Sequence, residues 1–257
     1  MCTFFSSIYI MNSVDVVLSI NVYKFPKFLL RQLATIQENL LCSYVVILNC
    51  NDHMKHALLE IKMPNNIYIN PTVINKKLDH GSLTKGIVSN IEYAINNFTF
   101  KHFIILSGRT VFYKQASLNN LDSLVKKWNN AEEMDTMTKG SFTNNDWHWP
   151  LFRSTLLAKH YLNLGYRLYG SEHEGLGFSF QVTKNIYTFV KSNPKLFEDL
   201  FEFNKCVEEF SLHTIASNEV SAENLEYSFY NLGHGASNCW DDTAENKYTK
   251  KIDYTED

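Results

Sequence analysis

Short apolar runs and segments with helical spacing alternate along the first half of this chain. The apolar runs are typical of buried strands and cover residues 14–20, 44–48, 66–69 and 102–106. The segments between them repeat apolar residues on one face, as amphipathic helices do, and cover residues 25–41, 53–61 and 82–97. This order predicts an α/β fold with a mostly parallel central sheet, flanked by the helices that connect its strands.

Polar residues follow three of these predicted strands at their carboxyl ends. They form the stretches Ser19–Asn21, Asn49–Asp52 and Ser107–Arg109. Ligands of open parallel sheets bind outside the carboxyl ends of the strands. These stretches are therefore the first candidates for a binding site.

The second half of the chain has a less regular pattern. It predicts helices at residues 117–128, 184–191 and 202–216 and a strand at residues 177–182. No internal repeat, low-complexity tract or linker divides the chain, so we expect a single domain over residues 1–257.

Composition excludes several classes of protein. The 257 residues include 24 Lys and Arg against 27 Asp and Glu, a net charge of −3, whereas proteins that coat nucleic acid are usually basic. No run approaches the ~20 apolar residues of a membrane span, and residues 1–10 lack the basic start and cleavage site of a secretory signal. We expect a soluble, cytoplasmic protein with no nucleic-acid partner and no transmembrane segment.

Three neighbouring segments carry a resemblance to a known family. They are His80-Gly-Ser-Leu-Thr-Lys-Gly-Ile-Val-Ser-Asn90, His102-Phe-Ile-Ile-Leu-Ser-Gly-Arg-Thr-Val-Phe-Tyr113 and Leu118-Asn-Asn-Leu-Asp-Ser-Leu124. Their order resembles the core-2/I-branching β-1,6-N-acetylglucosaminyltransferase family, which includes the peptide xylosyltransferases. The family's strand ends in Leu-(Ser/Cys)-Gly-Gln-Asp, followed by an aromatic–Pro pair. Here Arg109 and Thr110 replace Gln-Asp, and Tyr113 stands at the proline position.

Three later segments extend this resemblance. Gly177-Phe-Ser-Phe-Gln-Val-Thr183 is similar to a family strand, and Val207-Glu-Glu-Phe-Ser-Leu-His-Thr-Ile215 is similar to the helix that carries the catalytic base. The second match implies Glu209 as the base and Glu208 as the partner acid. Lys250-Lys-Ile-Asp253 is similar to the family's Asn-Lys-Phe-Asp, whose lysine holds the donor diphosphate. This match implies Lys251, with Lys250 beside it, for that role.

The resemblance implies a nucleotide-sugar-binding fold of the GT-A type. Residues 14–115 would form the nucleotide-binding half and residues 116–257 the acceptor and catalytic half, with residues 1–13 disordered or an N-terminal addition. The implied reaction is the transfer, with inversion, of N-acetylglucosamine or xylose from a uridine diphosphate sugar to a hydroxyl of a glycan or other acceptor. An inverting transfer needs one base to remove the proton of that hydroxyl.

The charge of the departing diphosphate also has to be neutralised. Many sugar-nucleotide enzymes use an Asp-x-Asp pair and a divalent ion, but this sequence contains no Asp-x-Asp. Fixed Lys and Arg side chains can supply the same positive charge, so we expect a metal-independent reaction with no cofactor. Two alternatives stay open: a metal-dependent transferase that uses Asp241 and Asp242, and a non-catalytic carbohydrate- or nucleotide-binding module on the same fold.

The remaining candidates fall into two sets. The set expected to bind the donor is Asn21, Asn51, Asp52, Ser107, Gly108, Arg109, Lys250 and Lys251. The set expected to bind the acceptor, by stacking or by hydrogen bonds to hydroxyls, is Trp147, Trp149, Glu172 and Glu174. Each residue has a structural alternative: Asp52 as a helix cap, Arg109 in an ion pair, the tryptophans in the core, and the other charged residues in solvent.

Overall fold

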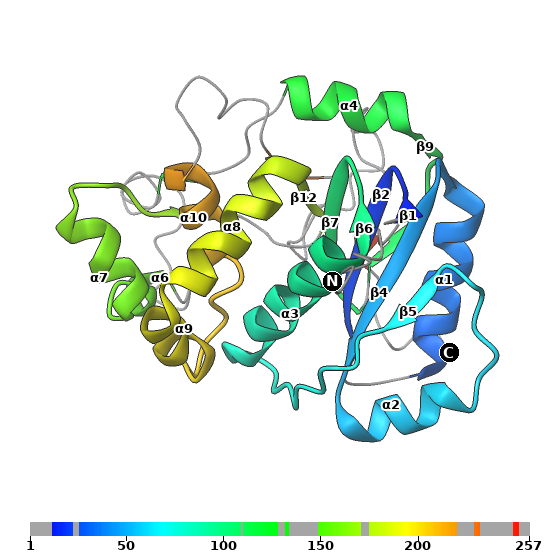
Figure 1. The fold of residues 1–257 in the computed structure, drawn as a ribbon, viewed down its shortest axis with the longest axis horizontal. Coiled ribbons are helices and arrows are strands. Elements are labelled where there is room, and N and C mark those ends of the chain that lie inside the picture. Colours follow the sequence, from blue (N-terminus) through cyan, green and yellow to red (C-terminus); the bar gives the residue numbers. More distant parts are fainter. Residues whose placement is uncertain are drawn as a thin grey trace, which may run out of the picture.

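A six-stranded sheet forms the centre of the protein (Figure 1). The computed structural model describes residues 12–22, 26–108, 110–127, 132–133, 149–170, 175–219, 229–231 and 249–251. The strands lie in the order β13 (Phe229–Asn231), β12 (Leu176–Ser179), β7 (His102–Leu106), β2 (Val16–Val22), β4 (Tyr44–Cys50) and β5 (Ile67–Ile69).

The sheet is mixed, so the α/β class is confirmed but the expected mostly parallel sheet is only partly correct. Neighbouring strands are parallel from β7 through β2 and β4 to β5, whereas β12 is antiparallel to both β7 and β13. The N–H of Gly175 donates to the carbonyl of Ile105 (2.7 Å), so the chain enters this part of the sheet at the carboxyl end of β7. From that entry point β12 has to run back against β7.

The helices mostly follow the predicted pattern. They are α1 (Pro26–Asn39), α2 (Asp52–Leu59), α3 (Ser82–Asn97), α4 (Leu118–Lys127), α6 (Trp149–Phe152), α7 (Leu156–Asn163), α8 (Phe180–Ser192), α9 (Pro194–Phe201) and α10 (Ser211–Glu219). The bounds of α3 and β7 are those predicted from the sequence.

Two predictions in the second half are wrong. The predicted strand at residues 177–182 turns into α8 after Ser179, because the Ser179 hydroxyl accepts the N–H of Val182 and caps the helix. The predicted helix at residues 202–216 begins only at Ser211, because residues 202–210 form turns against the start of α3.

Alternate residues of each strand point into two separate apolar layers, as the period of two in a strand requires. One layer includes Val17, Ile47 and Phe103 and is covered by α3 and α8. The other includes Leu18, Val46 and Ile104 and is covered by α1 and α2. The sheet is thus buried on both faces, and the ribbon shows α1 and α2 on one side of it and α3 and α8 on the other (Figure 1).

Within the described residues, four short strand pairs lie outside the central sheet. They are β1 (Asn12–Ser13) with β6 (Phe98–Thr99), β3 (Leu40–Leu41) with β9 (Ala116–Ser117), β10 (Glu132–Glu133) with β11 (Tyr169–Gly170), and β8 (Thr110–Phe112) with β14 (Thr249–Lys251). The last pair joins the segment after β7 to a segment near the carboxyl end of the sequence.

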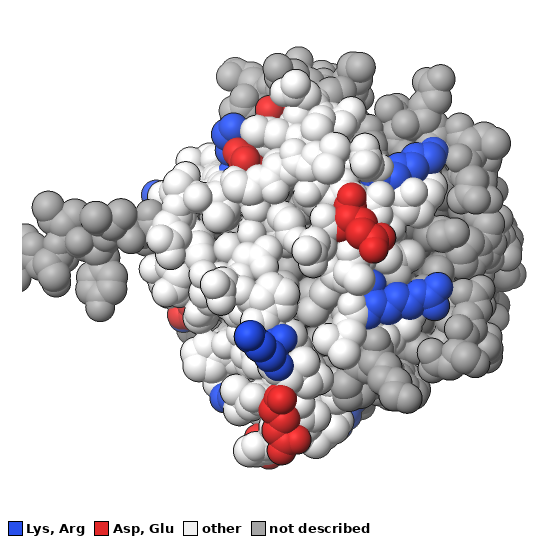
Figure 2. Space-filling view, turned by 90° about the vertical axis from the view of Figure 1, so that its right-hand side faces the viewer, with Lys and Arg blue, Asp and Glu red and all other residues white. Residues whose placement is uncertain are grey.

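Charges of both signs are scattered over the face shown in Figure 2, with uncharged surface between them. No broad basic patch is visible on the described part of that face, in keeping with the net charge of −3. None of the described helices is both long enough and apolar enough to cross a bilayer.

Candidate functional site

The order of the strands places a topological switch point between β2 and β7. From β2 the chain proceeds through α1 to β4 and through α2 to β5, always toward one edge of the sheet. Helix α3 then crosses back and delivers β7 to the other side of β2. A crevice opens at such a point outside the carboxyl ends of the two strands, and ligands of open α/β sheets bind there. The residues at these two ends are Asn21 and the turn that begins at Ser107.

Asn21 connects the end of β2 to the first turn of α3. Its Nδ2 donates to the carbonyl of Leu83 (2.9 Å). Its Oδ1 lies so close to Gly86 that a Cβ at that position would overlap it, so a larger residue there would displace the Asn21 side chain. A Cβ at Gly108 would lie 3.6 Å from the carbonyl oxygen of Asn21. Three candidate elements, the ends of β2 and β7 and the start of α3, are therefore adjacent.

The turn after β7 is held by hydrogen bonds from within and from α1. The Thr110 hydroxyl accepts the N–H of Ser107 (3.2 Å), which closes the turn. Gln32 Nε2 donates to the carbonyls of Ser107 (2.8 Å) and Thr110 (2.6 Å), which ties the turn to α1. Arg109 lies outside the described residues.

Sequence reasoning missed Gln32, although the sequence carried a signal. Its side chain is fully buried, and it occurs among Leu29, Leu33 and Ile36 on the apolar face of α1. An amide on such a face needs a buried hydrogen-bond partner, which the turn supplies.

Strand β14 brings the two candidate lysines to the same turn. Lys251 is paired with Thr110 and Lys250 with Val111 in the antiparallel β8–β14 ladder. The structure describes these two lysines by their backbone. Their main chain lies directly beside the residue that closes the turn.

The candidates after β4 have other partners. Asn51 is buried, and its Oδ1 accepts the N–H of Lys76 (2.9 Å). Asp52 is exposed, lies 3.8 Å from His56 (Oδ1 to Nε2), and is the first residue of α2 rather than its cap, a position that Asn51 occupies. A carboxylate in a first turn is favoured by the helix dipole. Asp52 therefore has a local role that does not need a ligand.

Lys76 is a buried cation that sequence reasoning also missed. Its side chain is 5% exposed, and its Nζ donates to the carbonyl of Ile74 (3.0 Å) and lies 3.5 Å from Asn51 Oδ1. Burial lowers the pKa of Lys76 to about 7, with Cys50 as the titratable group that opposes this shift. Its Cε would crowd a Cβ at Gly86, just as Asn21 would. In the sequence Lys76 lies between two exposed polar residues, Asn75 and Lys77, so no pattern set it apart.

Glu208 and Glu209 lie in the turn before α10, not inside a helix. Glu208 is 1% exposed and Glu209 is half-buried, while Val207 and Phe210 on either side are buried in the core. Phe210 stacks on Phe152, with ring centroids 5.6 Å apart. The two carboxylates thus differ in burial, and the neighbouring apolar residues hold the turn in place.

The segment that leads to these glutamates is attached to the start of α3. The carbonyl of Phe203 accepts the N–H of Gly81 (2.8 Å), and Cys206 Sγ donates to Asp79 Oδ1 (3.0 Å). Since Asn21 bonds Leu83 in the first turn of the same helix, α3 links the glutamate segment to the switch point.

Most acceptor candidates fall outside the residues that the structure describes. Trp147, Glu172 and Glu174 are among these, and of Trp149 only the backbone is described, at the start of α6. Glu174 directly precedes Gly175, whose N–H bonds Ile105 near the carboxyl end of β7. Asp241 and Asp242 also lie outside the described residues, within which no group of three His, Cys, Asp or Glu could hold a metal ion.

The sequence was compared with models of known protein families and with curated proteins, and nothing matched in either comparison.

Proposed function

We propose that the protein is an inverting, metal-independent glycosyltransferase on a fold of the GT-A type. The donor would be a uridine diphosphate sugar carrying N-acetylglucosamine or xylose, and the acceptor a hydroxyl of a glycan or another molecule. The observation that carries the proposal is the β8–β14 pairing, which sets Lys251 beside Thr110 at the switch point. Two segments that are far apart in the sequence, and that the same family resemblance implies for the donor site, are therefore adjacent beside the carboxyl end of β7, where sheets of this kind bind ligands.

A diphosphate leaving group suits this edge of the sheet. Negative charge builds up on the diphosphate as the bond to the sugar breaks, and cations that are already in position stabilise it. Lys250, Lys251 and Arg109 would supply these cations. The amide of Asn21 and the backbone around Ser107 and Gly108 would hold the nucleoside part of the donor.

In the proposed reaction the acceptor oxygen attacks the anomeric carbon from the side opposite the diphosphate. A new carbon–oxygen bond forms while the bond from the anomeric carbon to the diphosphate oxygen breaks, and its electron pair leaves with uridine diphosphate. The hydroxyl proton passes to the carboxylate of Glu209. Glu209 is preferred to Glu208 as the base because it is half-buried, whereas Glu208 is only 1% exposed.

The test is Glu209→Gln, assayed for transfer from UDP-N-acetylglucosamine and UDP-xylose. Without a base, transfer should fall by about 100-fold or more, while donor affinity measured by calorimetry stays within about twofold. Glu38→Gln, an exposed change on α1, is the matched control and should leave transfer unchanged. Full transfer activity in Glu209→Gln would refute the mechanism.

The same assay separates the two alternatives. A binding module would bind the donor and never release uridine diphosphate, whereas a transferase releases some by transfer to water. A metal-dependent enzyme that uses Asp241 and Asp242 would lose activity in chelator and regain it with manganese. The proposed reaction should proceed in chelator.

A further inference from the structure

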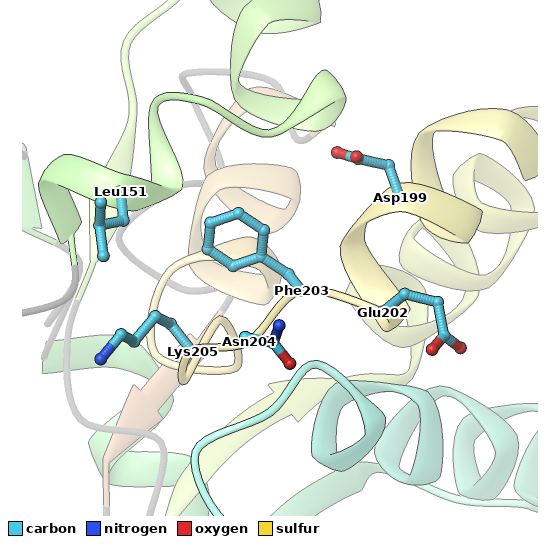
Figure 3. A pocket seen from close by; sticks show the side chains of 6 residues that line it. All are labelled: Leu151, Asp199, Glu202, Phe203, Asn204 and Lys205. Atoms are coloured by element: carbon cyan, nitrogen blue, oxygen red, sulfur yellow. The ribbon is translucent and has the colours of Figure 1, made fainter.

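A cavity of about 400 Å³ opens beside the segment that leads to Glu209 (Figure 3). It lies between α6, the end of α9 and the turn that follows α9. Its lining residues are Leu151, Asp199, Glu202, Phe203, Asn204 and Lys205. The volume falls within the roughly 300–1,000 Å³ of small-molecule sites.

Two apolar side chains form one part of the lining. The half-buried Phe203 ring stands in the middle of the cavity, with Leu151 on one side and Asp199 on the other (Figure 3). Leu151 is 48% exposed although it is a large apolar residue. Phe203 and Leu151 together offer an apolar surface to a small ligand.

Polar groups surround this surface. Asp199 Oδ2 accepts the N–H of Leu156 (2.8 Å) at the start of α7, which fixes the carboxylate and leaves its second oxygen for a ligand. The side chains of Asn204 and Lys205 make no hydrogen bond or ion pair with another residue of the described ranges. With Glu202, the lining has two carboxylates, one amide and one ammonium, a net charge of −1.

The residues that line the cavity are close in sequence to the proposed base Glu209 and to the acceptor candidate Trp149. Lys205 precedes Glu209 by four residues, which limits their separation to about 14 Å. Leu151 belongs to α6, which begins at the acceptor candidate Trp149. The bond between Gly81 and Phe203 holds the cavity wall against the start of α3.

We propose that this cavity is the acceptor subsite and binds a neutral sugar ring. One face of a sugar ring consists of C–H groups and would stack on Phe203, while its hydroxyls would donate to Asp199 and Asn204 and accept from Lys205. The net negative charge disfavours acidic sugars and nucleotides. As an acceptor site the proposal rests on the proposed function, but binding of a sugar here can be tested without catalysis.

The binding test uses saturation-transfer NMR with the methyl β-glycosides of galactose, glucose, N-acetylglucosamine and xylose as probes. At least one probe should receive saturation from the protein's aromatic protons. Phe203→Leu should weaken its affinity about tenfold, because the ring contact is lost while the apolar volume is largely kept. Tyr166→Leu, which removes another exposed aromatic ring, should leave the affinity within about twofold.

A second pair of variants tests the polar part of the lining. Asp199→Asn keeps an oxygen for the Leu156 N–H but removes the charge, so it should preserve the melting temperature and raise the acceptor KM without changing the donor KM. Glu198→Gln, an exposed change one residue earlier on α9, is the matched control. The acceptor KM in this assay is that of the glycoside that binds in the NMR experiment.

Three results would overturn the proposal. These are no saturation transfer to any probe, the same transfer in Phe203→Leu as in the wild type, and binding of a lysine-rich peptide in place of the glycosides. Failure of the proposed function gives a different pattern: glycosides bind in a Phe203-dependent manner, but UDP-sugars neither bind nor react. Glycoside binding should also persist in Glu209→Gln.

Discussion

The two sides of the proposed site differ in how many of their polar side chains are held by hydrogen bonds. On the donor side, Asn21 and Gln32 are bonded to backbone carbonyls of neighbouring elements, and Lys76 is enclosed with Asn51. On the acceptor side, Asp199 accepts the N–H of Leu156, but Asn204 and Lys205 have no such bonds within the described part of the chain. A donor side of this kind is preorganised, while the acceptor side can adjust to its ligand. Substitutions on the donor side should therefore change stability as well as binding, whereas substitutions of Asn204 and Lys205 should change binding alone.

The largest expected effect tests the charge of the donor side. Replacing both Lys250 and Lys251 by Ala should lower kcat/KM for the UDP-sugar by about 100-fold, because the cations opposite the diphosphate are removed. The exposed pair Lys62 and Lys159, replaced by Ala together, removes the same net charge elsewhere and should leave kcat/KM near the wild-type value. Wild-type kinetics in Lys250→Ala/Lys251→Ala would mean that the β8–β14 pairing has no part in donor binding.

The next largest effect tests whether the same side chain on the donor side contributes both to the free energy of unfolding and to donor affinity. Gln32→Leu leaves the carbonyls of Ser107 and Thr110 without their buried donor, which should cost about 1–3 kcal/mol in the free energy of unfolding. The turn should also lose its position, so donor affinity should fall. Both quantities are measured, by denaturant unfolding and by calorimetry with UDP.

Gln37→Leu on the exposed face of α1 is the control for this variant. If Gln32→Leu unfolds like the control and binds UDP equally well, the turn does not depend on α1, and the distinction between the two sides is lost.

The smallest expected effect, counted per pH unit, is a pH dependence of the free energy of unfolding that comes from Lys76. The folded-state pKa of about 7 lies below the ordinary lysine pKa of 10.5, so between these values the unfolded chain binds one more proton than the folded one. The free energy of unfolding should then rise with pH over that window, by at most about 1.4 kcal/mol per unit. Below pH 7 the charged form is buried, and its full desolvation penalty is present.

Lys76→Met should remove this slope and be more stable than the wild type near pH 6, since no charge is buried. Lys77→Met, an exposed neighbour, should keep the slope. The measurement is urea unfolding from pH 6 to pH 10, with each variant compared with the wild type at the same pH. Parallel curves for the wild type and Lys76→Met would show that Lys76 carries no such penalty.

The first half of the fold could be predicted because its signals are local. The apolar face of residues 82–97 and the apolar run at 102–106 are complete within one element, and the structure has both at the predicted bounds. The strand predicted at residues 177–182 and the helix predicted at residues 202–216 were wrong because contacts beyond the local pattern decided their structure. A cap at Ser179 and the contacts of residues 203–206 with the start of α3 override the local pattern.

The candidate site also has a part that could be predicted from local sequence signals and a part that depends on distant contacts. The carboxyl ends of β2, β4 and β7 were predicted as binding positions, since ligands of parallel sheets bind at the carboxyl ends of the strands. The position of Gln32 on an apolar helix face signalled a buried amide, but its partners could not be predicted because they lie far away along the chain. Lys76 could not be predicted at all, because its burial depends on how a loop folds over the sheet.

By itself the sequence determined which segments become strands and helices in the parallel half and which polar residues end those strands, because spacing along the chain dictates which face of an element is apolar. Only the tertiary structure decided that the sheet is mixed, that Lys251 pairs with Thr110, that Glu208 is more deeply buried than Glu209, and that Phe203 faces a cavity. These features depend on contacts between distant segments. They are set by the packing of the whole chain, which local periodicity does not encode.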